Sequence, residues 1–266
     1  MMSPLVLYHD NCPDGFTAAW AVRCALGDQA EYRAMNYGQH MPSSPSDYEA
    51  QRLIFVDFSL PRLELEALIH FGAHVEIYDH HKTAQVDLAD LTGAKVVFDM
   101  ERSGAGIAWD EFHPWATARL GLRPPLISYV EDRDLWRWAL PDSREINEYV
   151  FSVERTFDRW DELAAMVEGQ IGTVVGAGRA LLRAKRVRVE KVCENVRWLT
   201  FAASAEAIPI VNAAWDFSEI GEYLCGKFPH AVCGGYYFDR ADKRQWGFRS
   251  RGDFDVSALC NQYGGG

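Results

Sequence analysis

The first half of the chain alternates short apolar runs with amphipathic segments, and this alternation limits the possible folds more than any other feature. The apolar runs predict buried strands, and the segments between them have the period of helices. The expected strands are 4–9, 53–57, 74–79 and 95–99, and the expected helices are 16–26, 61–72 and 104–121, the last kinked or divided at Pro114. Strands and helices in alternation are typical of a doubly wound, mainly parallel α/β sheet.

The pattern changes after residue 153. Residues 154–196 have helical periodicity and no strand pattern, which predicts a helical connector. Beyond the connector, a smaller α+β domain is expected, with strands at 198–202, 208–213, 231–239 and 245–250 and a helix at 218–228. We therefore expect a first domain over 1–153, the connector over 154–196 and a second domain over 197–266.

The charge balance restricts the classes of partner. The chain has 27 Lys and Arg against 38 Asp and Glu, a net charge of −11. This balance argues against stable duplex DNA binding through a basic face. It does not exclude a phosphate substrate, because cations held by carboxylates reverse the local field.

The cysteines and the apolar runs restrict the cellular location that we expect for the protein. The six cysteines are scattered and form no C-x-x-C pair, so neither a zinc ribbon nor a disulfide framework is predicted. No apolar run approaches the roughly 20 residues of a membrane span, and the amino terminus lacks a signal-peptide pattern. We expect a soluble, cytoplasmic protein without a membrane partner.

Acids and histidines collect at the carboxyl ends of the expected strands. The segment VEIYDHHKTAQ places three of them in a row directly behind a strand. Ligands of open α/β sheets bind outside the carboxyl ends of the strands, so these side chains are expected to converge. The groups concerned are His9, Asp10, Asp14, Asp57, Asp79, His80, His81, Asp132 and Asp134. Taken singly, such residues also fit polar turns and helix caps.

Convergence of these groups would make a metal site. Carboxylates crowded together without a cation raise one another's pKa and weaken the fold. Several carboxylates with one or two imidazoles suit Mn²⁺ better than a structural zinc. The number of ligands predicts two divalent ions, with Mg²⁺ or Co²⁺ as alternatives to Mn²⁺ and with Asp57 as the bridging carboxylate. Two metals about 3.5–4 Å apart are the standard device for phosphoryl displacement.

Four ordered motifs resemble those of the DHH phosphoesterase superfamily. They are YHDNCPDGFTAAWA at 8–21, VDFS at 56–59, YDHH at 78–81 and YVEDRDLW at 129–136. The final GFRSRGDFDVSALCNQYGGG at 247–266 is similar to the DHH-associated domain, which closes over the substrate. The resemblance covers nearly the whole chain. It implies a phosphohydrolase that uses two metals to activate water, related to RecJ-type exonucleases, nanoRNases, nucleotide phosphatases, cyclic-dinucleotide phosphodiesterases, pyrophosphatases and exopolyphosphatases.

The resemblance also implies roles for single residues. The triplet Asp79, His80 and His81 is implied to be catalytic, with one histidine on a metal and the other near the phosphate. The implied metal ligands are His9, Asp14, Asp57, Asp79, His81 and Asp132. The first motif departs from the family, because the first of the two acids that many members carry falls on Cys12, and Asp14 holds the second place.

Two further segments are candidates for substrate binding. Ser103 and Gly104 open an expected helix, where backbone N–H groups favour a phosphate or a nearby carboxylate. In the second domain the resemblance implies substrate contacts by Arg249, by Ser250 and by a glycine-rich motif at Gly264, Gly265 and Gly266. That motif normally continues into a histidine, so the second domain is expected to be truncated at Gly266.

The substrate is less constrained than the chemistry. We expect nucleotides or short single-stranded oligonucleotides, with a hydrolase of polyphosphate or pyrophosphate as one alternative. A non-catalytic nucleotide- or phosphate-binding protein on the same fold is the other. Aromatic residues of the second domain either stack on bases or form its core; they are Tyr236, Tyr237, Phe238, Trp246 and Phe248. The sequence leaves the oligomeric state open.

Overall fold

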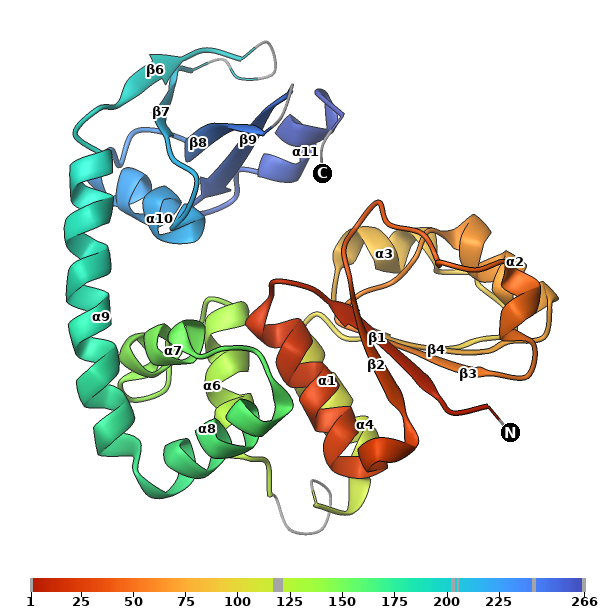
Figure 1. The fold of residues 1–266 in the computed structure, drawn as a ribbon. Helices are drawn as coiled ribbons and strands as arrows, with labels where there is room; N and C mark the ends of the chain where they lie inside the picture. Colours follow the sequence, from red (N-terminus) through yellow and green to blue (C-terminus); the bar gives the residue numbers. More distant parts are fainter. Residues whose placement is uncertain (1, 117–121, 202–203, 205, 241–242, 265–266) are drawn as a thin grey trace. The chain divides into compact units, whose positions relative to one another are not determined.

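The structure, a computed structural model, describes residues 2–116, 122–201, 204, 206–240 and 243–264. They form two compact units, Met1–Arg179 and Ala180–Gly266, each with its own sheet (Figure 1). The division falls inside helix α9, Ile171–Val192, which lies in the segment expected to be a connector. None of the helices in the described ranges is long and apolar enough to cross a membrane.

The first unit is built on a five-stranded, all-parallel sheet in the order β2-β1-β3-β4-β5. Its strands are β1 Leu5–His9, β2 Glu31–Met35, β3 Arg52–Val56, β4 His74–Asp79 and β5 Lys95–Phe98. Its described helices are α1 Pro13–Leu26, α2 Arg62–His70, α3 Lys82–Asp87, α4 Gly104–Phe112, α6 Pro125–Asp134, α7 Ser143–Ser152, α8 Phe157–Gly169 and the first part of α9, with 3₁₀ turns at Gly27–Gln29 and Pro45–Tyr48. The expected α/β architecture is confirmed.

Alternate residues of the strands face two separate cores, as the period of a strand requires. Leu7 and Phe55 pack with Leu65 and Leu68 of α2 on one face of the sheet. On the other face Ile54 belongs to the cluster built with α1, α4, α6 and α8. Figure 1 shows α2 and α3 on one side of this sheet and α1 and α4 on the other.

The strand order reverses next to β1. The chain leaves β1 for β2 on one side of it, and then places β3 on its other side. Adjacent strands on either side of such a reversal leave a crevice at their carboxyl ends, where parallel sheets bind ligands. His9 ends β1, Asp57 directly follows β3, and Asp79 ends β4. The sheet therefore brings the carboxyl ends of these strands to one edge.

The second unit has a four-stranded mixed sheet in the order β6-β7-β8-β9, in which β7 and β8 are parallel. Its strands are β6 Arg197–Leu199, β7 Ile208–Asn212, β8 Cys233–Arg240 and β9 Lys243–Ser250, and its helices are α10 Phe217–Lys227 and α11 Val256–Asn261. Apolar side chains on the two faces of this sheet form separate clusters. The expected smaller α+β architecture is confirmed.

Two elements differ from the sequence expectation. Strand β2, EYRAM, was not expected because it lies at the sheet edge and only Met35 is buried, so it lacks an apolar pattern. Helix α4 ends at Phe112, and His113 caps it directly before Pro114, as the expected break at that proline requires. Residues 117–121 of the expected helix 104–121 lie outside the described residues.

Candidate metal centre

Asp57 is the centre of the site. It lies immediately after β3, is 1% exposed and has a φ of 53°, in the left-handed region that few residues other than glycine, Asn and Asp adopt. Its N–H donates to the carbonyl oxygen of Tyr78 at 2.9 Å. A side chain at Gly104 would place its Cβ 2.4 Å from the Asp57 Cβ, so only glycine lets α4 begin this close to Asp57.

Three imidazoles surround the Asp57 carboxylate. The Nε2 atom of His80 lies 3.1 Å from Asp57 Oδ1, and the Nδ1 atom of His81 lies 4.0 Å from the same oxygen. On the other side, the Nδ1 atom of His9 lies 3.6 Å from Asp57 Oδ2, beyond hydrogen-bond distance. The His9 Nδ1 and Asp57 Oδ2 atoms are both buried, and neither has a hydrogen-bond partner among the described residues. One carboxylate thus faces histidines from the ends of β1 and β4.

A second group of ligands lies on the other side of His80. The His80 Nε2 atom is 3.8 Å from Asp14 Oδ2 and 3.5 Å from Asp134 Oδ2. Asp14 is 1% exposed and accepts hydrogen bonds from the N–H groups of Gly104 at 2.7 Å and Ala105 at 3.1 Å. The amino terminus of α4 therefore holds a carboxylate, which is one of the two anions expected there.

Asp79 organises the turn that carries the two histidines. Its Oδ1 atom accepts from the N–H of His80 at 2.7 Å, from the N–H of His81 at 3.2 Å and lies 2.6 Å from His81 Nδ1. Asp79 is fully buried, and its Oδ2 atom has no hydrogen-bond partner in the described part of the chain. In this arrangement Asp79 orients His81 and lies outside the three-residue groups that could hold a metal.

The structure places Asp134, and not Asp132, beside His80. Both carboxylate oxygens of Asp132 accept backbone N–H groups, from Ala139 at 2.8 Å and from Leu140 at 3.3 Å, so this acid holds the loop after α6. The sequence assignment of Asp132 as a terminal ligand is therefore corrected to Asp134. The helical period does not separate the two acids, because Asp134 follows the buried Val130 by four residues and Asp132 follows the buried Tyr129 by three.

Ion pairs join α6, which carries Asp134, to α4, whose amino terminus binds Asp14. The Arg123 guanidinium binds Glu131 of α6 at 2.8 Å and Asp110 of α4 at 2.9 Å. Glu131 also accepts from the N–H of Ser103 at 3.1 Å. These contacts hold the amino terminus of α4 next to α6, so the positions of Asp14 and Asp134 depend on charges outside the site.

The donor atoms form three overlapping groups, each within 4.8 Å. These are His9 with Cys12 and Asp57, Asp57 with His80 and His81, and Asp14 with His80 and Asp134. Carboxylates and imidazoles in this number suit divalent cations. The unpaired buried atoms of His9 and Asp57 support the same conclusion, since a buried polar atom without a partner is costly unless something binds it. The residues present fit divalent metal ions, and Asp57 belongs to two of the three groups.

The charges of the metal-free site are strongly coupled. Burial opposes the charged form of His80, but the hydrogen bond to Asp57 and the charges of Asp14 and Asp134 outweigh it and raise the His80 pKa to about 10. Burial and the charge of Asp57 raise the pKa of Asp134 to about 6. Burial, Asp134 and Asp57 likewise raise the pKa of Asp14. Without a cation the site therefore retains protons.

This proton retention predicts opposite pH dependences with and without metal. Protonated His80 stabilises the metal-free fold fully below its usual pKa of 6.5, and this contribution is lost as the pH rises through about 10. Metal binding needs neutral imidazole and charged carboxylates, so it strengthens over the same range. We expect the free energy of unfolding in chelator to fall from pH 6.5 to about pH 9, and the added stability in Mn²⁺ to increase. Denaturant titrations measure both, and His80→Gln should flatten the slope in chelator. A rising slope in chelator would contradict the His80 environment.

Ser103 and Gly104 do not present free groups for a substrate. Ser103 is fully buried, and its Oγ atom accepts from the N–H of Gly106 as the cap of α4. The N–H of Gly104 is bound to Asp14. The expectation that these two residues contact substrate is replaced by a structural role, because their polar groups already position the helix and a carboxylate.

An exposed aromatic residue next to the site was not predicted. Tyr37 is 51% exposed, and its ring packs against His9 at 5.1 Å and His81 at 5.7 Å between centroids. With Phe58 it lines a hollow of about 240 Å³, which we call the Tyr37 hollow. No sequence pattern marks this residue, because Tyr37 follows the edge strand β2 in a loop.

In the second unit, a hollow of about 920 Å³ is lined by Trp246, Arg249 and Gly264, and we call it the Trp246 hollow. Arg249 is exposed there. Ser250, the last residue of β9, is not among its lining residues. Gly265 and Gly266 lie outside the described residues. Of the aromatic candidates, Tyr236, Trp246 and Phe248 line the hollow, although Tyr236 and Phe248 are also part of the core.

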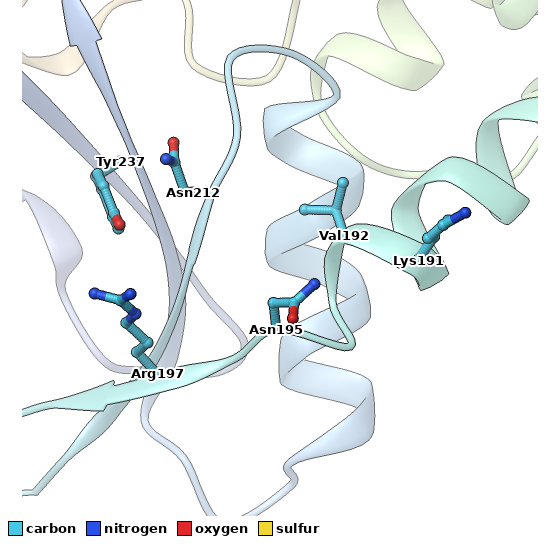
Figure 2. A pocket seen from close by; sticks show the side chains of 6 residues that line it. All are labelled: Lys191, Val192, Asn195, Arg197, Asn212 and Tyr237. Atoms are coloured by element: carbon cyan, nitrogen blue, oxygen red, sulfur yellow. The ribbon is translucent and has the colours of Figure 1, made fainter.

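Another hollow of the second unit, of about 410 Å³, opens near the end of α9. Figure 2 shows its lining, with Lys191 from α9, Arg197 from β6, Asn212 from β7 and Tyr237 from β8. Tyr237 is 9% exposed and belongs to the apolar core, so this aromatic candidate is mainly a packing residue.

The fold is similar to that of solved proteins. The chain has the fold of DHH-domain proteins, as two structures show. The DHH domain of a member of a family of ribosomal proteins is 13% identical, with a TM-score of 0.64, over 97% of this chain and 75% of that one. RecJ from Thermus thermophilus in complex with Mn²⁺ is 16% identical, with a TM-score of 0.51, over 98% of this chain and 47% of that one.

The comparisons by sequence are less informative. No family model matches the chain. An uncharacterized protein of Acanthamoeba polyphaga mimivirus is 24% identical over 279 residues, covering 98% of this chain. The chain spans 65% of the length of that curated relative.

Proposed function

We propose that the chain is a metal-dependent phosphohydrolase that cleaves phosphate esters of nucleotides or short oligonucleotides. The observation that carries this proposal is Asp57, one buried carboxylate at the strand-order reversal, shared by groups of histidine and aspartate ligands. Shared carboxylates of this kind hold pairs of metal ions in phosphoesterases. The likeness to RecJ supports the same class of reaction.

The residues present would hold divalent cations, and we propose Mn²⁺ for the carboxylate-rich group of Asp14, His80 and Asp134. Such cations, when bound, lower the pKa of water and stabilise charge on phosphoryl oxygens. Asp14 is held in place by the α4 amino terminus. Asp57 is held by its left-handed backbone and by the absence of a side chain at Gly104. The chain thus fixes the ligands before a substrate arrives.

We propose that His81 contacts the phosphate. Its Nδ1 atom is bound to Asp79, which leaves Nε2 as the atom that can reach a substrate. Burial opposes its charged form, but the hydrogen bond to Asp79 and the charges of Asp79 and Asp57 raise its pKa. A protonated imidazole donates a charge-assisted hydrogen bond, which suits a phosphoryl oxygen that gains negative charge in the transition state.

Tyr37 supports a nucleotide over a polyphosphate. Its ring is half exposed beside His81 and borders the Tyr37 hollow, so it offers a face on which a base can stack. In the second unit, Arg249 adds a cation to the Trp246 hollow, and we propose that it binds an anionic group of the substrate.

A substrate panel tests the proposal. The full chain with Mn²⁺ would be assayed on a dinucleotide, a bisphosphate nucleotide, a cyclic dinucleotide, pyrophosphate and polyphosphate, with chelator as the blank. We expect metal-dependent release of product from at least one of the three nucleotide substrates. Release from pyrophosphate or polyphosphate alone would show the alternative substrate class. Binding without turnover on every substrate would show a non-catalytic binding protein.

Tyr37 gives a second prediction on the same assay. Removing a stacking aromatic costs about 1–3 kcal/mol per base, so Tyr37→Ala should raise KM for the dinucleotide by about 5- to 150-fold. Tyr37→Phe keeps the ring and should leave KM near that of the parent. An unchanged KM in Tyr37→Ala would remove the ring from the substrate site, while equal losses in both variants would show that the hydroxyl matters instead.

A further inference from the structure

The two outer groups of donor atoms around Asp57 differ in chemistry. One group contains the thiol of Cys12 with His9 and Asp57, and the other contains Asp14, His80 and Asp134. We infer that the first group is a thiophilic, zinc-type site and that the second takes a harder cation, so that two metals of different kinds bind on the two sides of the Asp57–His80 pair. This inference rests on the proposed function only in that both assume metal ions at this edge of the sheet.

Unpaired buried atoms point to an ion in the first group. His9 Nδ1 and Asp57 Oδ2 face each other at 3.6 Å, and neither has a hydrogen-bond partner among the described residues. Asp57 is 1% exposed, so water does not satisfy its carboxylate from outside. Ligand atoms around one tetrahedral ion with bonds of about 2.0–2.1 Å lie about 3.4 Å apart, close to the observed separation.

The backbone brings Cys12 to the same place. Cys12 is the amino-terminal cap residue of α1, and its side chain makes no capping hydrogen bond. A Cβ at Gly15 would lie 2.4 Å from the His9 carbonyl oxygen, so glycine allows the first turn of α1 to pack on the end of β1.

The ligand types select different metals. Thiolate and imidazole are the preferred ligands of Zn²⁺ and of Co²⁺ that replaces it, and three protein ligands with an open position are typical of catalytic zinc. The second group offers carboxylates and a single imidazole without sulfur, which suits Mn²⁺ or Mg²⁺. A carboxylate at position 12 would have made the two groups alike.

Cobalt spectroscopy tests the inference directly. The full chain, stripped of metal by a chelator, would be titrated with Co²⁺ while the near-ultraviolet sulfur-to-cobalt charge-transfer band is recorded. We expect the band in the parent protein and in Cys24→Ser, whose exposed cysteine lies on the same helix. We expect no band in Cys12→Ser. Bound Co²⁺ without the band in the parent, or an unchanged band in Cys12→Ser, would overturn the inference.

Competition between metals gives a second readout that does not depend on hydrolysis. Zn²⁺ should abolish the band in the parent protein, while Mn²⁺ in excess should leave it. Cys12→Asp restores a charged ligand, and we expect it to shift the preference from Zn²⁺ toward Mn²⁺ on the order of 10–100-fold, the scale of changes in the ligand environment. Equal preference in the parent and Cys12→Asp would overturn the inference.

The outcomes separate this inference from the proposed function. A cobalt–thiolate band in a protein that cleaves no phosphate ester would overturn the proposed function and keep the thiophilic site. Hydrolysis with Mn²⁺ in a protein that shows no band would keep the proposed function and overturn the thiophilic site. A protein that binds neither Co²⁺ nor Zn²⁺ would overturn the inference, and one that also fails to bind Mn²⁺ would overturn both.

Discussion

Asp57→Asn should abolish hydrolysis and weaken metal binding at the two groups of ligands that contain Asp57. Asn has nearly the same shape and also tolerates the left-handed φ of 53°, so the fold should be kept. The variant loses the one charge that faces His9, His80 and His81 together. Because the charge stabilisation that a metal supplies is worth several kcal/mol, we expect kcat/KM to fall at least about 10³-fold.

Calorimetry with Mn²⁺ and steady-state kinetics measure this loss. Asp10→Asn is the matched control, since Asp10 directly follows β1 as Asp57 follows β3, but its oxygens accept from Asn11 and Asn36 and lie outside the three ligand groups. The control should bind metal and turn over as the parent does. Two undiminished metal sites in Asp57→Asn would show that this carboxylate is not shared.

The acids at strand ends were predictable from the sequence because the strands themselves were. Asp57 follows and Asp79 ends a largely buried strand, and the two strands pair in a parallel sheet. Their position at the carboxyl edge of the sheet therefore follows from topology alone. His80 and His81 come with Asp79 on the same turn. For these residues, local pattern and global fold give the same answer.

The acids on helices were harder to place. Asp132 and Asp134 are two residues apart on α6, so a motif alone does not say which one faces the sheet. The helical period does not decide it either, because Asp134 follows the buried Val130 and Asp132 follows the buried Tyr129 at helical spacing. Only the contacts distinguish them: Asp132 accepts N–H groups from Ala139 and Leu140, whereas Asp134 lies near His80.

Other parts of the site depend on contacts that no local pattern encodes. The hydrogen bond from the Gly104 N–H to Asp14 joins residues 90 positions apart, and it shows which of the two expected anions, a phosphate or a carboxylate, lies at this helix start. Tyr37 reaches His9 and His81 from a loop after an edge strand that itself lacked an apolar pattern. Both features arise from packing between distant segments, which a period or a motif does not report.

The paired substitutions Asp134→Asn and Asp132→Asn should separate metal binding from loop stability. The charge of Asp134 is unfavourable in the metal-free fold, where burial and the charge of Asp57 raise its pKa to about 6. Above that pH, Asp134→Asn should therefore leave the metal-free protein as stable as the parent or more so. It should also reduce the stabilisation by Mn²⁺ and lower kcat/KM by about 10- to 100-fold or more.

Asp132→Asn should do the opposite. The Asp132 carboxylate is the acceptor for the N–H groups of Ala139 and Leu140, and the amide keeps only one acceptor oxygen. Leaving a buried donor without its partner costs about 1–3 kcal/mol, so the free energy of unfolding should fall by that amount with and without metal. Denaturant unfolding and Mn²⁺ calorimetry on both variants decide the assignment. If Asp132→Asn lost metal affinity while Asp134→Asn kept it, Asp132 would be the ligand, and the loop contacts seen here would have to open when metal binds.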